Sequence, residues 1–404
     1  MMKKNNLLIL AVAALGFAAC ANDETTAVNE KLAESNAISF RANVNGLMRG
    51  IDVNQTWLQD GSNGFKVRAT LTTGGAQYFP ETQYTYSAGT YTSTQKYYWP
   101  QTEALDFFAW AASGNDVTHT ENTYEFTVTP NSAAASQSDL VVACTKNKTK
   151  TGTYNPSDVY NQSAGSQTSQ YGANGVPLNF RHAGTKVTIT LTNSNTDGLD
   201  FVIRDASICN VKGTGVFTFD PTTATDNQTT TSNGGATLAL SQWETSTVPT
   251  TTNYSQTITS LTTLAQDWIL IPQTFTYATA YSGSSEGNPF NGPCIKVSLK
   301  IKNHGSEIYI VGSASGENDG YVTAMWPLSA PASGWLPGKK YTYTVDLAGG
   351  GYYPANTTAG TGTNLDPILE GAEIKFVTVT VDEWPAGDAT SVYTGSTPST
   401  PVVP

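Results

Sequence analysis

The chain has 404 residues and a formal net charge of −11, and only 13% of its residues are charged. This length corresponds to about two domains, and the negative charge argues against binding to nucleic acid or to an anionic membrane surface. Gly, Thr, Ser, Asn and Tyr are abundant. Such a composition is typical of β-rich extracellular proteins, because β-branched and aromatic residues fill strands and small polar residues make turns.

Residues 1–19 have the form of a lipoprotein signal peptide. Two lysines precede an apolar run over residues 7–19, which is shorter than the roughly 20 residues needed to cross a bilayer as a helix. Cys20 follows two alanines and is the expected acceptor for a lipid such as palmitate. A plain secretory signal followed by a chance cysteine is the alternative. Residues 20–36 are polar and acidic, which predicts a flexible tether.

A first block of strands is predicted over residues 37–176. Its first strand, 37–45, places Ile38, Phe40, Ala42 and Val44 on one apolar face, because polar residues alternate with them. Further strands are predicted at 64–71, in a hairpin over 84–98 that turns near Ala88-Gly89, and at 105–112, 124–129 and 139–145. Residues 146–176 are poor in aliphatic side chains and are predicted to form a long loop between two domains.

A second block of strands is predicted over residues 177–404. The strands are expected at 178–182, 186–192, 201–211, 215–219, 268–271, 295–302, 308–311, 341–345 and 374–384. No stretch after the leader shows convincing helical periodicity. The sequence therefore predicts an all-β fold, organised as two β-sandwiches in tandem.

Six short stretches are distributed over nearly the whole chain in a distinctive order. They are Tyr98 to Pro100, Leu105 to Trp110, Leu178 to Val187, Ile269 to Gln273, Trp335 to Tyr341 and Val377 to Trp384. Together with the lipoprotein leader, they resemble the fimbrillin family, the lipoprotein pilins of type V pili in Gram-negative anaerobes. The resemblance implies two tandem transthyretin-like β-sandwich domains and a structural subunit of a surface fimbrium that serves adhesion. It implies no enzyme activity and no cofactor.

The same resemblance implies proteolytic processing and assembly by strand exchange. In the family, a protease cuts after an Arg or Lys that follows the first strand, and the vacated groove receives a strand from the next subunit's C-terminal region. Here it implies a removable strand that contains Ile38, Phe40, Ala42 and Val44, with cleavage between Arg49 and Gly50. An ordinary surface arginine is the alternative for Arg49, and Arg41 competes in charge but lies within the strand. The implied partners are other pilin subunits, the outer membrane through the lipid before processing, and an unidentified surface ligand.

The predicted donor end has a less regular pattern. Ile374 and Phe376 share one face of the last strand, whereas Val377, Val379 and Val381 lie on the other. This change of phase predicts either a strand buried on both faces or a bulge near Phe376. The prolines near the C-terminus each remove a backbone donor and weaken that stretch as a strand. A tip-subunit role therefore stays open beside a shaft role.

Residues that carry chemistry are sparse. His119, His182 and His304 form no metal-ligand pair or nucleophile motif, and we expect structural roles for them. The pairs Asp220 with Asp226 and Glu317 with Asp319 do not match a calcium-binding loop. We therefore expect no catalytic residue and no metal site.

Three cysteines remain if Cys20 is lipidated. Cys144, Cys209 and Cys294 are widely spaced, and the chain has no CxxC pair, which disfavours a zinc site or a thiol redox motif. Buried thiols are the expected state, and one disulfide among the three stays open.

Eight tryptophans raise an alternative function, a monomeric surface lipoprotein that binds glycans through exposed aromatic rings. Trp57, Trp243 and Trp326 lie in irregular surroundings and are the better candidates for exposure. The other five lie in or beside predicted strands. A core role is favoured, because large aromatic side chains dominate burial in β-sandwiches.

Overall fold

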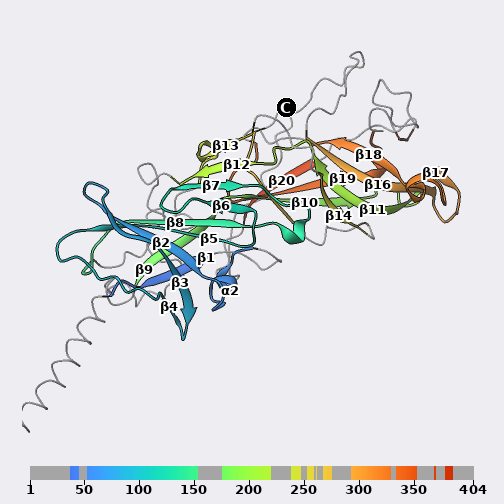
Figure 1. Cartoon of the computed structure of the whole chain (residues 1–404). Coiled ribbons are helices and arrows are strands. Elements are labelled where there is room, and N and C mark those ends of the chain that lie inside the picture. The colour runs from blue at the N-terminus through green and yellow to red at the C-terminus, as the bar shows by residue number, and fades with distance from the viewer. Residues whose placement is uncertain are drawn as a thin grey trace, which may run out of the picture.

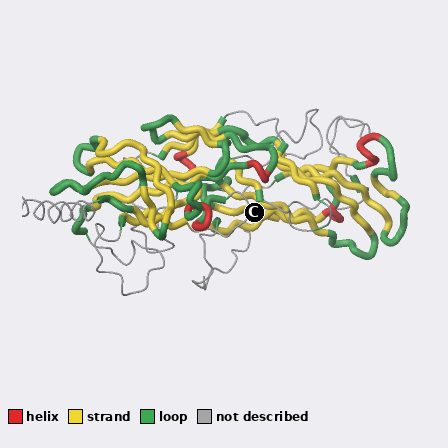
Figure 2. Tube along the Cα trace, turned by 60° about the horizontal axis from the view of Figure 1, so that its bottom comes forward, coloured by secondary structure: helices red, strands yellow, loops and turns green. Residues whose placement is uncertain are grey.

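The computed structural model describes residues 37–44, 52–152, 175–219, 238–246, 253–258, 261, 267–274, 293–328, 334–352, 368–369 and 378–384. The leader, the tether, and the predictions for Cys20, Arg49, Gly50, Asp220, Asp226, Ile374, Phe376 and Val377 lie outside these residues. Within them the fold is all-β, as predicted, and the strands form an elongated molecule (Figure 1, Figure 2). No helix in these ranges is long and apolar enough to span a membrane.

The first half of the molecule is a closed barrel. Its strands are β1 (Phe40–Val44), β2 (Phe65–Leu71), β3 (Gln77–Ser87), β4 (Thr90–Thr92), β5 (Leu105–Ala112), β8 (Leu140–Lys148) and β9 (Val176–His182). Among the described residues, they follow one another around the barrel in the order β1-β4-β3-β2-β5-β8-β9. The turn between β3 and β4 falls at Ala88 and Gly89, whose φ angles of 49° and 88° suit a tight hairpin.

The second half is a β-sandwich. One sheet has the order β15 (Trp268–Leu270), β10 (Thr185–Thr192), β19 (Lys339–Asp346) and β20 (Thr378–Glu383). The other has the order β14 (Tyr254–Thr257), β11 (Leu199–Cys209), β16 (Cys294–Asn303) and β17 (Tyr309–Val311), with β18 (Val322–Pro327) also paired to β16. Apolar side chains of both sheets meet in one buried cluster, including Ile189 and Tyr343 from the first sheet and Ile208 and Val297 from the second.

A third sheet joins the two halves of the chain. Its order is β13 (Trp243–Thr245), β12 (Gly215–Thr218), β7 (Glu125–Val128) and β6 (Val117–His119). It packs on the outer face of the barrel, where Phe126 and Phe217 share a buried cluster with Phe108 and Val142. Strands from both predicted blocks therefore build one sheet.

Helices are few and short in the described ranges. They are α2 (Gln55–Leu58) and the 3₁₀ turns η1 (Ala134–Ser136), η3 (Leu240–Gln242), η4 (Glu317–Gly320) and η5 (Leu347–Gly349). The sequence pattern misses α2, because one turn is too short to show a helical period. Its N-cap is Asn54, whose side chain accepts a hydrogen bond from Trp57 N at 2.9 Å.

Strand β9 belongs to the barrel. From the sequence, residues 178–182 are predicted to open the second block of strands, but β9 pairs with β1 and β8 of the barrel. Only Ala183 and Gly184 separate it from β10, which lies in the second sandwich. The chain thus passes directly from barrel to sandwich at this point, and the division at residues 176 and 177 stays a prediction about domains.

Candidate assembly groove

Strand β1 completes the barrel. It pairs in parallel with β9 from Phe40 opposite Val176 to Val44 opposite Phe180, and antiparallel with β4 where Phe40 lies opposite Tyr91. Just before the strand, Ile38 N donates to Tyr97 O at 2.7 Å. Without β1, the edges of β4 and β9 would lose their shared partner and expose unpaired backbone groups.

The apolar face of β1 fills the barrel interior. Ile38, Phe40 and Val44 are buried, with exposed fractions of 5%, 4% and 2%, and Ala42 is half-buried against the same cluster. The alternation read from the sequence therefore matches burial. Full burial of a side chain as large as Phe40 contributes roughly 2–3 kcal/mol.

Aromatic rings form the wall that receives Phe40. Its ring centroid lies 4.8 Å from that of Tyr84, 5.4 Å from that of Phe107 and 6.3 Å from that of Phe65, all near edge-to-face. Such arrangements are favourable beyond the buried area alone. Burial raises the pKa of Tyr84 to about 12, because the phenolate would lose its hydration. We call this apolar channel, together with the facing edges of β4 and β9, the assembly groove.

The end of β1 is held by the short helix that follows it in sequence. Val44 N donates to Gln55 Oε1 at 3.2 Å, and Gln55 Nε2 donates to Tyr91 Oη at 3.4 Å. The segment that contains Arg49 and Gly50 lies between Val44 and Asp52. Both of these flanking residues are buried, with 2% of each exposed.

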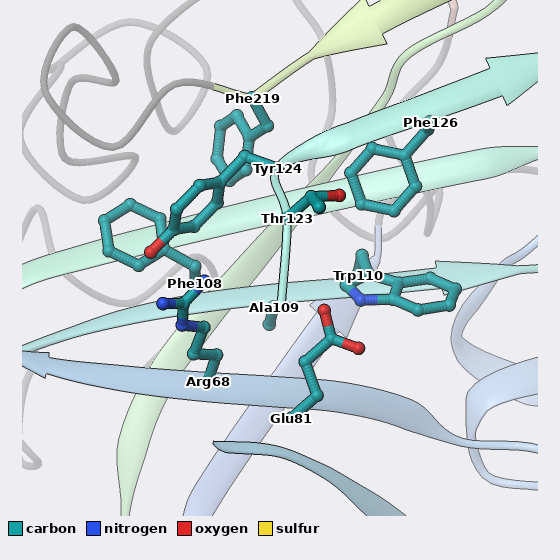
Figure 3. A pocket seen from close by; sticks show the side chains of 9 residues that line it. All are labelled: Arg68, Glu81, Phe108, Ala109, Trp110, Thr123, Tyr124, Phe126 and Phe219. Atoms are coloured by element: carbon teal, nitrogen blue, oxygen red, sulfur yellow. The ribbon is translucent and has the colours of Figure 1, made fainter. Parts of the chain in front are cut away.

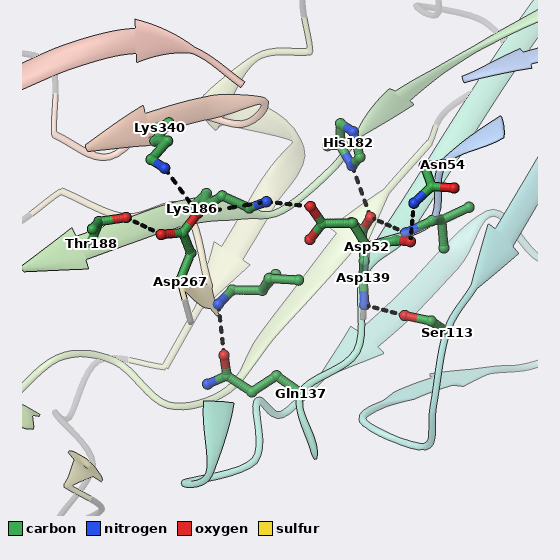
Figure 4. A network of polar contacts seen from close by, with 12 residues as sticks. Asp52, Asn54, Ser113, Gln137, Asp139, His182, Lys186, Thr188, Asp267 and Lys340 are labelled. Atoms are coloured by element: carbon green, nitrogen blue, oxygen red, sulfur yellow. Dashed lines mark hydrogen bonds and ion pairs between the residues drawn. The ribbon is translucent and has the colours of Figure 1, made fainter. Parts of the chain in front are cut away.

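Asp52 enters a buried polar network at the junction of barrel and sandwich (Figure 4). This junction network consists of Asp52, Asp139, His182, Lys186, Asp267 and Lys340. The Lys186 ammonium donates to the Asp52 carboxylate and lies 3.9 Å from Asp267 Oδ2, which also accepts from Lys340 Nζ at 2.9 Å. Burial raises the pKa of Asp52, and the attraction of Lys186 opposes this rise.

The second part of the junction network fixes residues next to Asp52. Asp139 Oδ2 accepts from Val53 N at 2.9 Å and lies 2.9 Å from His182 Nδ1. The His182 ring stacks on Trp384, with centroids 4.0 Å apart and an interplanar angle of 4°. Lys186 Nζ lies 4.7 Å from the centroid of the Trp384 ring. The junction network therefore joins the start of the segment after Gly50 to the residue that follows β20.

Of the last predicted strand, residues 374–384, Thr378 to Glu383 form β20. Among the described strands, β20 pairs only with β19 and lies at the edge of their sheet. Val379 is half-buried and packs against the sandwich core, and Val381 lies opposite Tyr341. Trp384 is 4% exposed, and its backbone N donates to Gly338 O at 2.8 Å.

Apart from His182, for which a structural role is expected, the residues of the junction network are not predicted from the sequence. A weak signal was present for two of them, since Asp52 stands between Ile51 and Val53 and Lys186 opens an alternating apolar strand. A charged residue at such a place needs a buried partner. The sequence does not identify the partner, which comes from a distant part of the chain.

A small pocket lies between the barrel and the third sheet (Figure 3). It is lined by Arg68, Glu81, Trp110, Tyr124 and five apolar or small side chains around them. Its free volume of about 10 Å³ is near the minimum that holds one water molecule. The Arg68 Nε, Glu81 Oε2 and Trp110 Nε1 atoms are buried without a protein partner, which suits a bridging water. The volume of about 10 Å³ is too small for a sugar ring.

The tryptophan prediction is partly wrong. Trp326 is 0% exposed and Trp243 8% exposed, so neither offers a stacking face to solvent, whereas Trp57 is half-buried. Trp326 lies in β18, a strand that the sequence analysis misses, and its neighbours come from segments distant in the chain. Of the five tryptophans expected in the core, four are buried and Trp110 is half-buried beneath Lys66 Nζ, which lies 5.0 Å from the ring centroid.

The histidines have structural partners. His119 lies between Glu81 Oε1 and the Glu125 carbonyl, and His304 Nδ1 is 2.9 Å from Asp200 Oδ1. In the described part of the chain, no group of three or more His, Cys, Asp or Glu residues is arranged to hold a metal ion. Glu317 and Asp319 lie in the exposed turn η4.

These features define an all-β protein whose described residues are organised around an apolar groove filled by the first strand. A family comparison matches residues 53–384 with the fimbrillin-like family, so the chain belongs to that family. Among solved structures, a fimbrial protein from Bacteroides vulgatus has a TM-score of 0.48 and 13% identity, with 86% of this chain and 99% of that chain covered. A fimbrilin from Porphyromonas gingivalis has a TM-score of 0.42 and 11% identity, with 87% and 98% covered. No curated protein matches the chain.

Proposed function

We propose that this protein is a structural pilin subunit of a surface fimbrium. In this proposal the chain is exported as a lipoprotein, anchored to the outer membrane through Cys20, and cleaved after Arg49. It then polymerises by donor-strand exchange into an extracellular fibre that serves adhesion. The work is done by backbone pairing and apolar contacts, so the proposal assigns no catalytic residue and no cofactor.

The observation that carries the proposal is the position of β1. It lies between β4 and β9, fills the barrel with Ile38, Phe40 and Val44, and precedes the segment that contains Arg49. A strand in this position can be replaced by another strand that supplies the same backbone bonds and apolar side chains. Its departure would leave an edge with a strong tendency to pair.

Cleavage after Arg49 would separate β1 and the lipid at Cys20 from the rest of the subunit. The new N-terminus would be Gly50, two residues before Asp52. Asp52 is bound to Lys186, and Val53 N donates to Asp139 Oδ2. The junction network would therefore hold the new terminus in place after β1 has left.

The proposed donor is the C-terminal region that includes β20. Among the described strands, β20 has one partner to release, fewer than a strand inside the sheet would have. Trp384, the residue after β20, is held in place by His182, Lys186 and the Gly338 carbonyl. Donation of β20 itself would require the release of this anchor.

The test compares Arg49→Ala with Arg41→Ala in the purified lipidated precursor. An arginine-specific protease is expected to remove the first strand from the natural chain and from Arg41→Ala, and to leave Arg49→Ala uncut. The cut chains should then form ladders that survive mild denaturant. Mass spectrometry should place the lipid on Cys20 and the mature N-terminus at Gly50.

Two results would contradict this proposal. Cleavage of Arg49→Ala at the same rate as the natural chain would show that another site is processed. Cut chains that stay monomeric while binding glycans would favour a monomeric glycan-binding lipoprotein instead.

A further inference from the structure

Two of the three cysteines outside the leader face each other across paired strands. Strands β11 and β16 run antiparallel, and Cys209 lies directly opposite Cys294 in the last pair of their ladder. Directly opposed residues in such a ladder have Cα atoms about 4.5–5.5 Å apart. This spacing lies within the range of roughly 4.4–6.8 Å that disulfides require.

The two thiols lie on the face of the sheet that is turned away from the sandwich core. Their neighbours Ile208 and Ile295 belong to the main core cluster, whereas Cys209 and Cys294 form a separate small cluster with Met325. Tyr352 packs against this cluster and exchanges two backbone hydrogen bonds with Met325. Both thiols are fully buried beneath this cover.

The surroundings make the two thiols chemically unequal. The pKa of Cys209 is lowered to about 7, first by the hydrogen bond from the Cys294 thiol and then by Ser207, with a smaller effect from Lys296. Ser207 Oγ lies 3.5 Å from Cys209 Sγ. The pKa of Cys294 is raised by the same thiol–thiol hydrogen bond and by burial. Cys209 is therefore the better nucleophile, since the thiolate is the reactive form.

We propose that Cys209 and Cys294 form a disulfide in the exported protein. The oxidant is a disulfide of the thiol-oxidoreductase class, which export compartments contain. The Cys209 thiolate attacks one sulfur of the donor disulfide and releases the other as a thiolate. The Cys294 thiolate then attacks Cys209 Sγ and releases the first donor sulfur. The donor leaves as a dithiol that has taken up two electrons and the two cysteine protons.

The third cysteine supplies an internal control. Cys144 lies in β8 and belongs to the cluster between the barrel and the third sheet, apart from the other two. The segment from Cys209 to Cys294 carries β12, β13, β14 and β15. The Cys209–Cys294 bond would join the two ends of this segment, because β11 ends at Cys209 and β16 begins at Cys294.

Formation of the bond belongs early in folding. Tyr352 and Met325 both follow Cys294 in the chain, so β11 and β16 can pair before these residues cover the sulfurs. A donor disulfide needs access to the Cys209 thiolate for its attack. Once the cover has formed, the bond is shielded from external thiols.

The test uses the full chain exported from its own leader in a Gram-negative host. Thiols are trapped at lysis with one alkylating reagent under denaturing conditions, and a second reagent is added after reduction. Peptide mass spectrometry should find the second label on Cys209 and Cys294 in at least about tenfold excess over the first. Cys144 should carry the first label, and the non-reduced digest should contain the linked peptides. The first label on Cys209 and Cys294, or a link that includes Cys144, would overturn the proposal.

A stability measurement gives a second readout. Because the folded cover shields the bond, the chain is reduced in denaturant and refolded with reductant, which should lower the thermal midpoint of the natural chain and of Cys144→Ser by about 5 °C relative to the unreduced protein. The double variant Cys209→Ser/Cys294→Ser should show no response to the reductant. An equal response in all three proteins would contradict the proposal. Neither measurement depends on cleavage at Arg49 or on fibre formation, so this proposal and the proposed function can fail separately.

Discussion

Gly175, the residue before β9, lies close to the backbone of β1. This glycine has a φ of +82°, and a Cβ atom placed there would lie 3.1 Å from the Phe40 carbonyl carbon and 3.2 Å from its backbone nitrogen. Both the backbone conformation and the contact therefore favour glycine. Gly74 offers a comparison, because its φ is +81° but no atom lies within 4 Å of its hypothetical Cβ.

We expect Gly175→Ala to destabilise the protein more than Gly74→Ala does. The first substitution disturbs the packing of β1, and the second lies in the turn between β2 and β3. Both variants carry the strain of a positive φ, roughly 1 kcal/mol. Gly175→Ala adds a tight contact that the Phe40 backbone must relieve by a small shift, and we expect this to bring the total to about 2–3 kcal/mol. Chemical denaturation of the precursor measures the difference. A further readout is faster cleavage by the arginine-specific protease in Gly175→Ala only. Equal loss of stability in both variants would show that β1 does not need this close approach.

At the scale of elements, β1 is the barrel strand that the proposed cleavage would remove. Its backbone bonds join β4 to β9, and its side chains occupy the centre of an aromatic cluster. Phe40 belongs to the strand proposed to leave. Phe107 belongs to β5 and stays in the subunit, and its ring centroid lies 5.4 Å from that of Phe40.

This difference gives a prediction for the two forms of the protein. Phe40→Ala should destabilise the precursor by about 3–4 kcal/mol, because it leaves a cavity in the barrel. It should have no effect on assembled, cleaved subunits, from which residue 40 is absent. Phe107→Ala should destabilise both forms. Chemical denaturation of the precursor and of assembled fibres measures the two stabilities. If Phe40→Ala also lowered the stability of the fibre, β1 would not have been removed.

At the scale of the whole molecule, the junction network connects regions that are far apart in sequence. Asp52 follows the segment with Arg49, Lys186 lies in β10, Asp267 precedes β15, and Trp384 follows β20. Buried ion pairs add little net stability, but removal of one partner leaves an uncompensated charge. The network therefore links the barrel to the sandwich, and loss of one of its residues should destabilise both.

Lysine substitutions test this connection. Lys186→Met should lower the free energy of unfolding by about 3–5 kcal/mol, because Asp52 loses its cation in a buried site. Lys340→Met is the matched control, since its side chain is 25% exposed against 6% for Lys186. We expect a loss of about 1–2 kcal/mol for Lys340→Met, because Asp267 keeps Lys186 and Thr188 as partners. Equal losses in urea denaturation would show that Asp52 does not depend on Lys186.

Much of the strand pattern could be predicted from the sequence. The predicted strand at 105–112 coincides with β5, and the one at 186–192 differs from β10 by one residue. In contrast, the sequence pattern does not predict β18, and it makes Trp326 one of the better candidates for exposure although it favours a core role for the tryptophans in general. The Trp326 side chain is buried in the sandwich core, and its ring lies close to Gly351, which is 25 residues further along the chain, where no local pattern reveals it.

The alternation of apolar and polar residues was enough to establish that Ile38, Phe40 and Val44 share a buried face. This is a local property, because successive side chains of any strand point to opposite sides. That strand pairs with β4 and β9. Cys209 lies opposite Cys294, and Asp52 forms an ion pair with Lys186. These pairings emerged only from the folded chain, because an alternating pattern shows which face of a strand is buried but not which distant segment lies against it.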